Sequence, residues 1–258
     1  MNRIQKCFAE RSGNILNIYL TAGYPALDAL PRTVLQLAAA GVDLVEVGMP
    51  YSDPLADGPT IQHSSQVALE NGMHLELLFR QIREIRAHSE IPIILMGYLN
   101  QVIQYGEERF LDQCQASGVD GLILPDLPLD EYEAVFQQPM QQRGLGISFL
   151  ITPQTSEARI RKIDALSTDF VYMVSRSSIT GGQSVFGPEQ IRYFERIAGL
   201  GLRNHRLIGF GISTAEAFAL ACRYADGGIV GSAFIRAVGN GSPVEGFVQK
   251  IRGLHVVS

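Results

Sequence analysis

The sequence predicts a single (β/α)8 barrel formed by residues 1–258, with an additional helix near the N-terminus. Short runs of Ile, Val and Leu alternate with amphipathic segments about eight times, and no Ser- or Pro-rich linker interrupts them. Two loops of about a dozen residues, 48–59 and 176–187, each follow a predicted strand. Loops of that length in a compact domain usually carry function. A doubly wound open sheet has the same local pattern, so the number of strands decides between the two folds.

The predicted strands are short and apolar, with glycine, proline or aspartate near most of their ends, as expected for strands buried on both faces. They are Ile15–Leu20, Leu44–Val47, Ile91–Met96, Gly121–Leu124, Gly146–Leu150, Phe170–Val174, Arg206–Gly209 and Gly228–Val230. Apolar residues at helical spacing predict helices between these strands. They cover Leu129–Arg143, Ile160–Leu166, Pro188–Gly199, Ala215–Tyr224 and Val244–Ile251, with two more before Gly41 and from Leu75 to Ile85.

Composition narrows the class of protein. Hydrophobic residues make up 46% of the 258 residues and the mean hydropathy is +0.10, which indicates a well-packed globular chain. The formal net charge of −5 disfavours a nucleic-acid or anionic-membrane surface. Three widely spaced cysteines do not form a disulfide framework, so a cytoplasmic protein is expected. The N-terminus lacks the apolar core of a signal peptide, and no apolar run is long enough to span a bilayer.

Glu46 stands inside a predicted apolar strand, directly before an acidic, proline-rich loop. Side chains alternate along a strand, so the two valines of this strand share one face and Glu46 takes the other. If the valines pack against helices, Glu46 points into the barrel near its upper rim. An unpaired carboxylate there is costly to ionise, so its pKa should be raised. The alternative is a buried ion pair, for which Arg176 is the basic residue near an adjacent strand end.

Two more acids lie in the loop that follows. Asp57 precedes Gly58, Pro59 and Thr60, a position that suits a helix-capping or turn-forming aspartate as well as a catalytic one. Asp53, in Ser-Asp-Pro, is interpreted as a turn former. The prolines of the loop restrict φ, which would help to hold the acids in place.

Glycine-rich turns follow the last two predicted strands. They read Ile208-Gly-Phe-Gly-Ile-Ser213 and Gly227-Gly-Ile-Val-Gly-Ser-Ala233, and each precedes a helix; the loop 176–187 adds Thr180-Gly181-Gly182. Glycine lets backbone N–H groups approach a ligand, and a helix N-terminus favours an anion. Tight turns need glycine in any case, but barrel enzymes usually bind phosphate after strands seven and eight. The sequence therefore predicts a phosphate site there.

Several reaction types are disfavoured because the predicted strand ends lack the residues that those reactions need. None of the three lysines follows a predicted strand, which disfavours a Schiff-base aldolase. The five histidines show no ligand spacing on a common face, which disfavours a zinc-type metal site. No cysteine is placed as an obvious nucleophile. Acid–base work by carboxylates on a small phosphorylated substrate remains, with Tyr172 on the predicted sixth strand as a candidate helper.

The stretch Glu46-Val-Gly-Met-Pro-Tyr-Ser-Asp-Pro-Leu-Ala-Asp-Gly-Pro-Thr-Ile-Gln62 closely resembles the signature of the tryptophan synthase α subunit family. Further matches run along the whole chain: Thr21-Ala-Gly-Tyr-Pro25, Pro125-Asp-Leu-Pro128, Tyr172-Met-Val-Ser-Arg176 with Thr180-Gly181, and Gly209-Phe-Gly-Ile-Ser213 with Gly231-Ser232. The resemblance implies a (β/α)8 lyase of tryptophan biosynthesis. It would cleave indole-3-glycerol phosphate to indole and glyceraldehyde 3-phosphate without a Schiff base or a metal.

The resemblance also implies roles for matching residues. Glu46 would be the general acid–base, which protonates the indole carbon that bears the glycerol chain and takes the proton of the adjacent hydroxyl. Asp57 would accept the indole N–H, Tyr172 would lie beside the substrate, and Thr180 would help the sixth loop to close over Asp57. The phosphate would be held by Gly181, Gly211, Gly231 and Ser232. Walls for the indole, which are equally suited to the core, would be Tyr19, Met96, Tyr98, Ile123 and Phe210.

Two residues depart from the family pattern. Tyr51 stands where the family usually has Phe, so its hydroxyl needs a partner. Ser178 stands where many members have Gly, which would change how freely the sixth loop moves.

The resemblance implies a partner, a pyridoxal-phosphate β subunit in an αββα assembly, and no cofactor in this chain. Neither nucleic acid nor a membrane is an expected partner. Two alternatives stay open: a free-standing indole-releasing lyase with the same site, and a non-catalytic phosphate-binding barrel.

Overall fold

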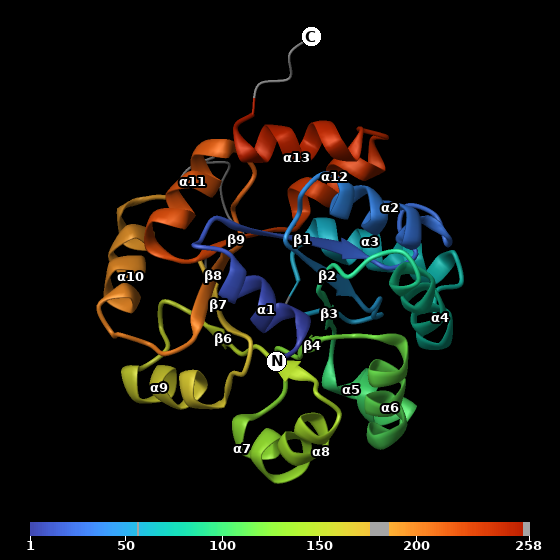
Figure 1. Cartoon of the computed structure of the whole chain (residues 1–258), viewed down its shortest axis with the longest axis horizontal. Coiled ribbons are helices and arrows are strands. Elements are labelled where there is room, and N and C mark those ends of the chain that lie inside the picture. The colour runs from blue at the N-terminus through green and yellow to red at the C-terminus, as the bar shows by residue number, and fades with distance from the viewer. Residues whose placement is uncertain (56, 176–185, 255–258) are drawn as a thin grey trace.

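The computed structural model describes residues 1–55, 57–175 and 186–254. Its strands form a ring with helices outside, and α1 lies across one end of that ring (Figure 1). The strands are β1 (Ile15–Thr21), β2 (Leu44–Gly48), β3 (Ile93–Met96), β4 (Gly121–Ile123), β5 (Gly146–Ile147), β6 (Leu150–Ile151), β7 (Phe170–Val174), β8 (His205–Gly209) and β9 (Gly227–Val230).

The helices lie between the strands in the chain. They are α1 (Arg3–Glu10), α2 (Ala29–Ala39), α3 (Pro59–Glu70), α4 (Leu75–Arg86), α5 (Leu99–Tyr105), α6 (Glu107–Ser117), α7 (Leu129–Glu131), the π-helix η1 (Tyr132–Phe136), α8 (Gln137–Gln142), α9 (Glu157–Leu166), α10 (Pro188–Ala198), α11 (Ala215–Tyr224), α12 (Ser232–Gly239) and α13 (Val244–Arg252). Over the described ranges, none of these helices has the length and apolarity that a membrane span requires.

The parallel sheet closes into a barrel through its fifth strand. The strand order is β5-β4-β3-β2-β1-β9-β8-β7-β6, and each neighbouring pair is parallel. Ser148 and Phe149 alone separate β5 from β6, so the two are halves of one strand. The N–H of Ser148 donates to Leu122 O at 3.1 Å on one side, and Phe149 O accepts from Tyr172 N at 2.9 Å on the other. The predicted (β/α)8 barrel is confirmed.

The prediction of one continuous strand over Gly146–Leu150 was wrong in detail. The hydroxyl of Thr168 accepts the N–H of Ile147 at 2.8 Å, and the hydroxyl of Ser167 accepts that of Phe149 at 3.3 Å. These side-chain bonds take the place of backbone partners, so the regular strand is interrupted between β5 and β6.

The predicted helix over Leu129–Arg143 is also divided, into α7, η1 and α8. Pro139 lies in α8 and has no N–H to donate to the carbonyl of Val135 four residues earlier. Its ring also crowds that carbonyl, so the turn before it widens into a π-helical segment.

Alternation along the strands separates two apolar cores. Outward residues such as Leu16, Ile18, Val45 and Val47 pack with the surrounding helices in the larger core. Inward residues fill the barrel in a second core, which includes Ile15, Tyr19, Leu44, Ile94, Ile123 and Ile229. Glu46 is fully buried and shares the inward face of β2 with Leu44, as the alternation predicted.

Helix α1 closes the end of the barrel where the strands begin. Its buried residues Ile4 and Phe8 belong to the interior core, and the rings of Phe8 and Phe170 lie 6.0 Å apart. Asn2 caps the helix, and its Nδ2 also donates to Asp120 O at 3.2 Å and to Asp169 Oδ1 at 3.0 Å. The helix therefore acts as a plug that is fixed by hydrogen bonds to the starts of two strands.

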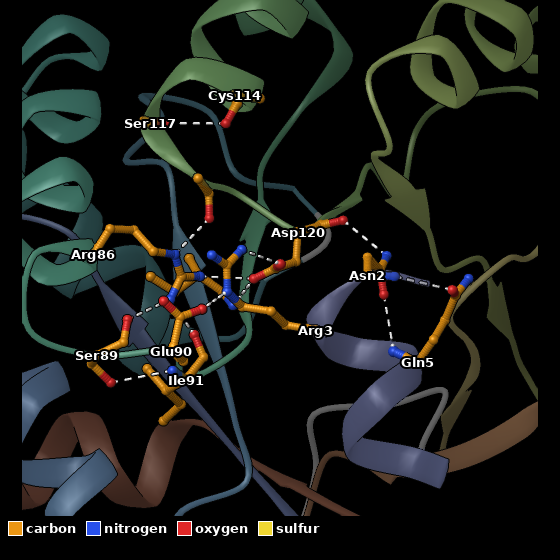
Figure 2. Close-up of polar contacts among 12 residues, drawn as sticks. Asn2, Arg3, Gln5, Arg86, Ser89, Glu90, Ile91, Cys114, Ser117 and Asp120 are labelled. Atoms are coloured by element: carbon orange, nitrogen blue, oxygen red, sulfur yellow. Dashed lines mark hydrogen bonds and ion pairs between the residues drawn. The ribbon is translucent and has the colours of Figure 1, made fainter.

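A network of charges around Asp120 strengthens this attachment (Figure 2). The Asp120 side chain is 3% exposed and accepts from Arg3 Nη1 at 3.1 Å and from Arg86 Nη2 at 2.7 Å. Arg86 also donates to the carbonyls of Gly118, Ser89 and Ile91. Because these hydrogen bonds satisfy both charges, the buried ion pair is tolerated.

Aspartates that precede strands fix the neighbouring strands in register. Asp43 accepts the N–H of Leu16 at 2.8 Å, and Asp226 accepts that of Arg206 at 2.8 Å. Asp120 accepts the N–H of Ile93 at 2.9 Å in the same way. Asp169 differs, because it is fully desolvated and its hydrogen bond comes from Asn2.

We predict that Asp169 makes the fold less stable at high pH. Burial raises the pKa of its carboxyl from 3.8 to about 7. The protonated form of Asp169 is therefore favoured in the folded state. Its contribution to the free energy of unfolding is fully present below pH 3.8 and is lost as the pH rises through about 7. Above pH 7 the free energy of unfolding of Asp169→Asn should exceed that of the wild type by a few kcal/mol, since each pKa unit corresponds to about 1.4 kcal/mol. Near pH 4 the two proteins should be equally stable.

Urea unfolding at several pH values measures this difference. Asp28→Asn, at an exposed position, is the matched control and should leave the pH dependence unchanged. A wild-type and an Asp169→Asn curve that stay parallel across the whole pH range would contradict the prediction.

Candidate active site

A cavity of about 210 Å³ opens at the carboxyl ends of the strands. Its walls come from β1, β2, β3, β7 and the turns after β2, β8 and β9, which are far apart in the sequence. Of the residues that the sequence analysis selected, the cavity is lined by Tyr19, Glu46, Asp57, Met96, Tyr172, Phe210, Gly211, Gly231 and Ser232. The structure thus brings both candidate carboxylates and most of the predicted phosphate-binding turns together.

Glu46 is a carboxylate held in apolar surroundings. Its Oε2 accepts a hydrogen bond from Asn17 Nδ2 at 3.0 Å, and its Oε1 has no partner within the described part of the chain. Burial, with a further contribution from the charge of Asp57, raises its pKa from 4.5 to about 8, while the bond from Asn17 opposes that rise. A group of this kind holds a proton near neutral pH and can deliver it. The ion-pair alternative finds no cation on Glu46 among the described residues.

Asp57 occupies the last turn of the loop before α3. Burial raises its pKa from 3.8 to about 6, and the hydroxyl of Tyr98, which donates to Oδ2 at 3.1 Å, opposes the rise. The N-cap of α3 is Gly58 and not Asp57, so the helix-capping alternative was wrong. Asp57 is 7% exposed and its side chain lines the cavity.

The rest of this loop is held by its own hydrogen bonds. The N–H of Asp57 donates to Pro54 O at 3.0 Å, and Gln62 Nε2 donates to Asp57 O at 2.9 Å. Asp53 accepts from the hydroxyl of Ser52 and lies in a turn, as predicted. The backbone bonds and the prolines fix the position of the Asp57 side chain.

Two glycines make room for the two tyrosines of the cavity. A Cβ on Gly48 would lie 2.1 Å from the hydroxyl of Tyr19, and one on Gly209 would lie 2.3 Å from that of Tyr172. The two rings therefore rest directly on the backbone of neighbouring strands. Burial raises the pKa of both phenols, so both stay neutral.

The turn after β8 and the start of α12 form the other end of the cavity. Phe210 and Gly211 both have positive φ, 68° and 83°, and Ser175 Oγ donates to Phe210 O at 2.5 Å. Positive φ in a non-glycine residue is a strain that concentrates at functional sites. Gly231 is the N-cap of α12, so backbone N–H groups and the helix dipole favour an anion here.

Some residues around the cavity were not selected from the sequence. Ile61, Ser213 and Arg236 line it, and Asn17 supports Glu46 from β1. Arg236 is the single cation among the described lining residues, and its Nη1 donates to Thr60 Oγ1 at 3.2 Å. The spacing held a signal for two of them: Asn17 lies two residues before Tyr19 on the same inward face, and Arg236 lies one helical turn after Ser232.

Other predicted residues lie beside the cavity or outside the described ranges. Tyr98 is buried and contacts Asp57 through its hydroxyl, and Ile123 belongs to the interior core with Met96. Thr180, Gly181 and Ser178 lie outside the described residues, as does Arg176. The hydroxyl of Tyr51, which departs from the family pattern, accepts from Asn100 Nδ2 at 3.2 Å, and its ring stacks on Tyr98 at 5.1 Å.

A larger hollow of about 780 Å³ lies at the opposite end of the barrel, around α1. Its charged residues include Arg3, Arg11, Asp43 and Asp120, which are engaged in ion pairs with one another or with neighbours. The smaller cavity is the better candidate, because two carboxyls with raised pKa values, Glu46 and Asp57, meet there with a helix start that favours an anion and with a cation. No group of three or more metal-ligating side chains occurs in the ranges that the structure describes.

Comparisons with known proteins agree on one family. A family model described as tryptophan synthase alpha chain matches residues 5–254. The tryptophan synthase alpha chain of Christiangramia forsetii is 50% identical over 256 residues, which cover 98% of this chain and 100% of the relative. The solved alpha chain of Legionella pneumophila subsp. pneumophila has a TM-score of 0.87 and 32% identity, covering 98% of this chain and 97% of that chain. A solved tryptophan synthase complex from Pyrococcus furiosus has a TM-score of 0.85 and 33% identity, covering 94% and 99%.

We predict that Gly209→Ala displaces the ring of Tyr172 from its seat on β8. The added methyl group overlaps the ring, so the free energy of unfolding should fall by about 1–3 kcal/mol. Urea unfolding followed by tyrosine near-ultraviolet circular dichroism reports both effects, since the chain has no Trp. Gly246→Ala is the control, because a Cβ there meets nothing within 4 Å inside α13, and it should gain up to about 1 kcal/mol. An unchanged stability of Gly209→Ala would show that Tyr172 does not rest on this glycine.

Proposed function

The chain belongs to the tryptophan synthase alpha chain family, and we propose that its cavity cleaves indole-3-glycerol phosphate by acid–base catalysis with Glu46 and Asp57. The chain is a lyase of tryptophan biosynthesis, and the products of the reaction are indole and glyceraldehyde 3-phosphate. The observation that carries the proposed mechanism is a fully buried carboxyl, Glu46, at the carboxyl end of a barrel strand and in the wall of the cavity.

Glu46 moves one proton in each half of the proposed reaction. In the first half it gives its proton to the indole carbon that bears the glycerol chain, and the ring becomes an indolenine with a positive nitrogen. In the second half the carboxylate takes the proton of the hydroxyl on the neighbouring chain carbon. That carbon becomes an aldehyde, the carbon–carbon bond breaks, and its electron pair restores the indole ring. Glu46 ends the cycle protonated, so it acts as a catalyst.

Asp57 is assigned to the indole nitrogen. An ionised carboxylate there accepts the N–H and stabilises the positive charge that the ring gains after protonation. Support comes from its place in the cavity wall and from the hydrogen bond with Tyr98, which favours the ionised form. Tyr19, Met96, Tyr172 and Phe210 are proposed as the walls for the flat ring, with Tyr98 and Ile123 supporting them.

The phosphate is assigned to the end of the cavity that is formed by the turn after β8 and the start of α12. Gly211, Gly231 and Ser232 present backbone N–H groups and the start of α12, and Arg236 adds a positive charge. Gly181, which the family resemblance selects for the phosphate, lies outside the described residues, as does Thr180, which the resemblance assigns to closure of the sixth loop over Asp57. A dianionic tail held here directs the indole of the same substrate toward Glu46 and Asp57.

We infer that this chain uses no cofactor of its own. The three lysines lie in α1, α9 and α13, and none lines the cavity, so none is placed to form an imine there. Pyridoxal phosphate is assigned to a partner β subunit. The thiols of Cys7, Cys114 and Cys222 are free, which fits a reaction in the cytoplasm.

A β subunit in an αββα assembly is the proposed partner, and the Pyrococcus furiosus structure is a tryptophan synthase complex. Apolar side chains are exposed on the loop after β2 and on neighbouring helices: Leu55 is 91% exposed, Ile103 49% and Leu69 38%. The hydrogen bond between Asn100 and Tyr51 links α5, which carries Ile103, to that loop. Burying these groups against a partner would remove apolar surface from water beside the mouth of the cavity.

The two alternatives are disfavoured by particular observations. A non-catalytic barrel has no need for a buried carboxyl with a pKa of about 8, which reduces stability. A free-standing lyase would have no use for Leu55, whose side chain is almost fully in solvent.

We predict that Glu46→Gln slows indole release from indole-3-glycerol phosphate by about 100-fold or more, because the amide has no proton of suitable acidity. The same variant should be more stable than the wild type above pH 8. Because the pKa is raised, the contribution of protonated Glu46 to stability is fully present below pH 4.5 and is lost as the pH rises through about 8. Indole is measured by its absorbance, and stability by thermal unfolding at pH 9.

Glu84→Gln, on the exposed face of α4, is the control and should change neither quantity. Full turnover by Glu46→Gln would disprove the proposed mechanism. Asp57→Asn should also lose most of the activity, since a neutral amide does not stabilise the positive ring.

We predict that Leu55→Glu weakens binding of a β subunit by about 10-fold or more, since it places a charge on an apolar contact. The stability of the isolated chain should not change, because the side chain is exposed. Titration of the β subunit, followed by the stimulation of indole release, gives the affinity. Leu254→Glu, at a position 62% exposed near the C-terminus, is the matched control. Equal affinity of both variants would place the interface elsewhere, and an isolated wild-type chain as fast as the mixture would favour the free-standing lyase.

A further inference from the structure

Asn17 is a buried polar side chain to which the mechanism above gives no role. It is fully buried on β1 and points into the barrel, in the layer below Tyr19. Its neighbours in register on the adjacent strands are Leu44 and Ile229, both apolar. An asparagine is therefore placed in an interior that is filled mainly by apolar side chains.

The contacts of Asn17 are incomplete. Its Nδ2 donates to Glu46 Oε2 at 3.0 Å, and its Oδ1 has no hydrogen-bond partner among the described residues. A buried amide with an unpaired oxygen costs stability compared with a leucine of similar size. Packing alone therefore does not explain this residue, and its one side-chain hydrogen bond goes to the proposed acid.

We propose that Asn17 is a positioning residue for the reaction, whose amide holds the Glu46 carboxyl in one orientation through both halves of the proton transfer. The proposal rests on the proposed role of Glu46. An amide carries both donors and an acceptor, so it can bond the ionised carboxylate through N–H and the protonated carboxyl through its oxygen. A leucine offers neither, and an aspartate would add a second negative charge.

The titratable groups that face Glu46 come from three elements. They are Tyr19 on β1, Asp57 in the loop before α3, and Tyr172 on β7. The adjacent strand β3 contributes Ile94 and Met96, which do not titrate. Because Asp57 disfavours ionisation of Glu46 and no described cation offsets it, the N–H of Asn17 is the main described group of the protein that stabilises the carboxylate left after the first proton transfer.

The test compares Asn17→Leu with the wild type in the pH profile of kcat/KM for indole release. The variant should lose roughly 10- to 100-fold in kcat/KM, because a hydrogen bond to a charged group is removed. Without the N–H, the carboxylate is less favoured, so the alkaline limb should move upward by about one pH unit. The midpoint of thermal unfolding should change little, because removal of the unpaired Oδ1 of Asn17 offsets the hydrogen bond that Glu46 Oε2 loses. Asn17→Val, which suits a strand and is smaller, is expected to behave alike and serves if Leu does not fit.

Gln81→Met is the matched control. Gln81 is also a buried amide whose Oε1 has no described partner, and its Nε2 donates to Leu27 O at 2.8 Å, far from the cavity. Its replacement should leave the shape of the pH profile unchanged.

Each other outcome rejects the proposal. An unchanged rate and profile in Asn17→Leu would show that Asn17 does not act on Glu46. A lower unfolding midpoint with the same loss of rate at every pH would assign Asn17 a structural role. The Glu46→Gln variant separates this failure from failure of the mechanism: an inactive Glu46→Gln with a normal Asn17→Leu rejects the positioning role alone, and an active Glu46→Gln rejects both.

Discussion

The structure depends on one electrostatic constraint, a carboxyl that is kept out of water with no described cation beside it. Within the described part of the chain Glu46 receives one hydrogen bond, and it shares its cavity with a second acid, so its ionisation is suppressed by both burial and charge. Such an arrangement reduces stability, and the rest of the barrel has to offset it. The dense packing of the two apolar cores, on the two sides of the strands, supplies that stability.

Buried carboxyls have different partners at the two ends of the barrel. At the end where the strands begin, Asp43 and Asp120 are paired with arginines and fix the register of neighbouring strands. At the other end, Glu46 and Asp57 have no counter-ion among the described residues, and each receives a hydrogen bond from a neutral group, Asn17 or Tyr98. A buried charge that is paired and hydrogen-bonded is tolerated and can fix strand register, whereas a buried carboxyl without a counter-ion has a raised pKa and is suited to proton transfer. The separation of structure and chemistry between two ends of one sheet follows from the barrel topology.

Alternation along strands was enough to predict the inward direction of Glu46 and its raised pKa, because both depend on local register and on burial. The helix-capping alternative for Asp57 could not be decided from spacing, since the N-cap position depends on where the loop delivers the chain to α3. Asn17 and Arg236 were missed because their importance arises from contacts with residues 29 and 176 positions away. The division of the fifth strand was missed for a similar reason, as it depends on the hydroxyls of Ser167 and Thr168.

The two carboxyls of the cavity differ in a way that fits the roles proposed for them. Burial raises the pKa of Asp57 to about 6 and that of Glu46 to about 8, so between these values Asp57 is ionised while Glu46 keeps its proton. The difference follows from burial first, because Glu46 is 0% exposed and Asp57 7%, and then from the charge of Asp57, which raises the pKa of Glu46 further; each acid has one neutral donor, Asn17 or Tyr98, that opposes the rise. Ionised Asp57 is suited to a positive ring, and protonated Glu46 to a carbon that must receive a proton. A pair of acids in unequal surroundings thus performs both parts of the chemistry near neutral pH without a metal or an imine in the proposed mechanism.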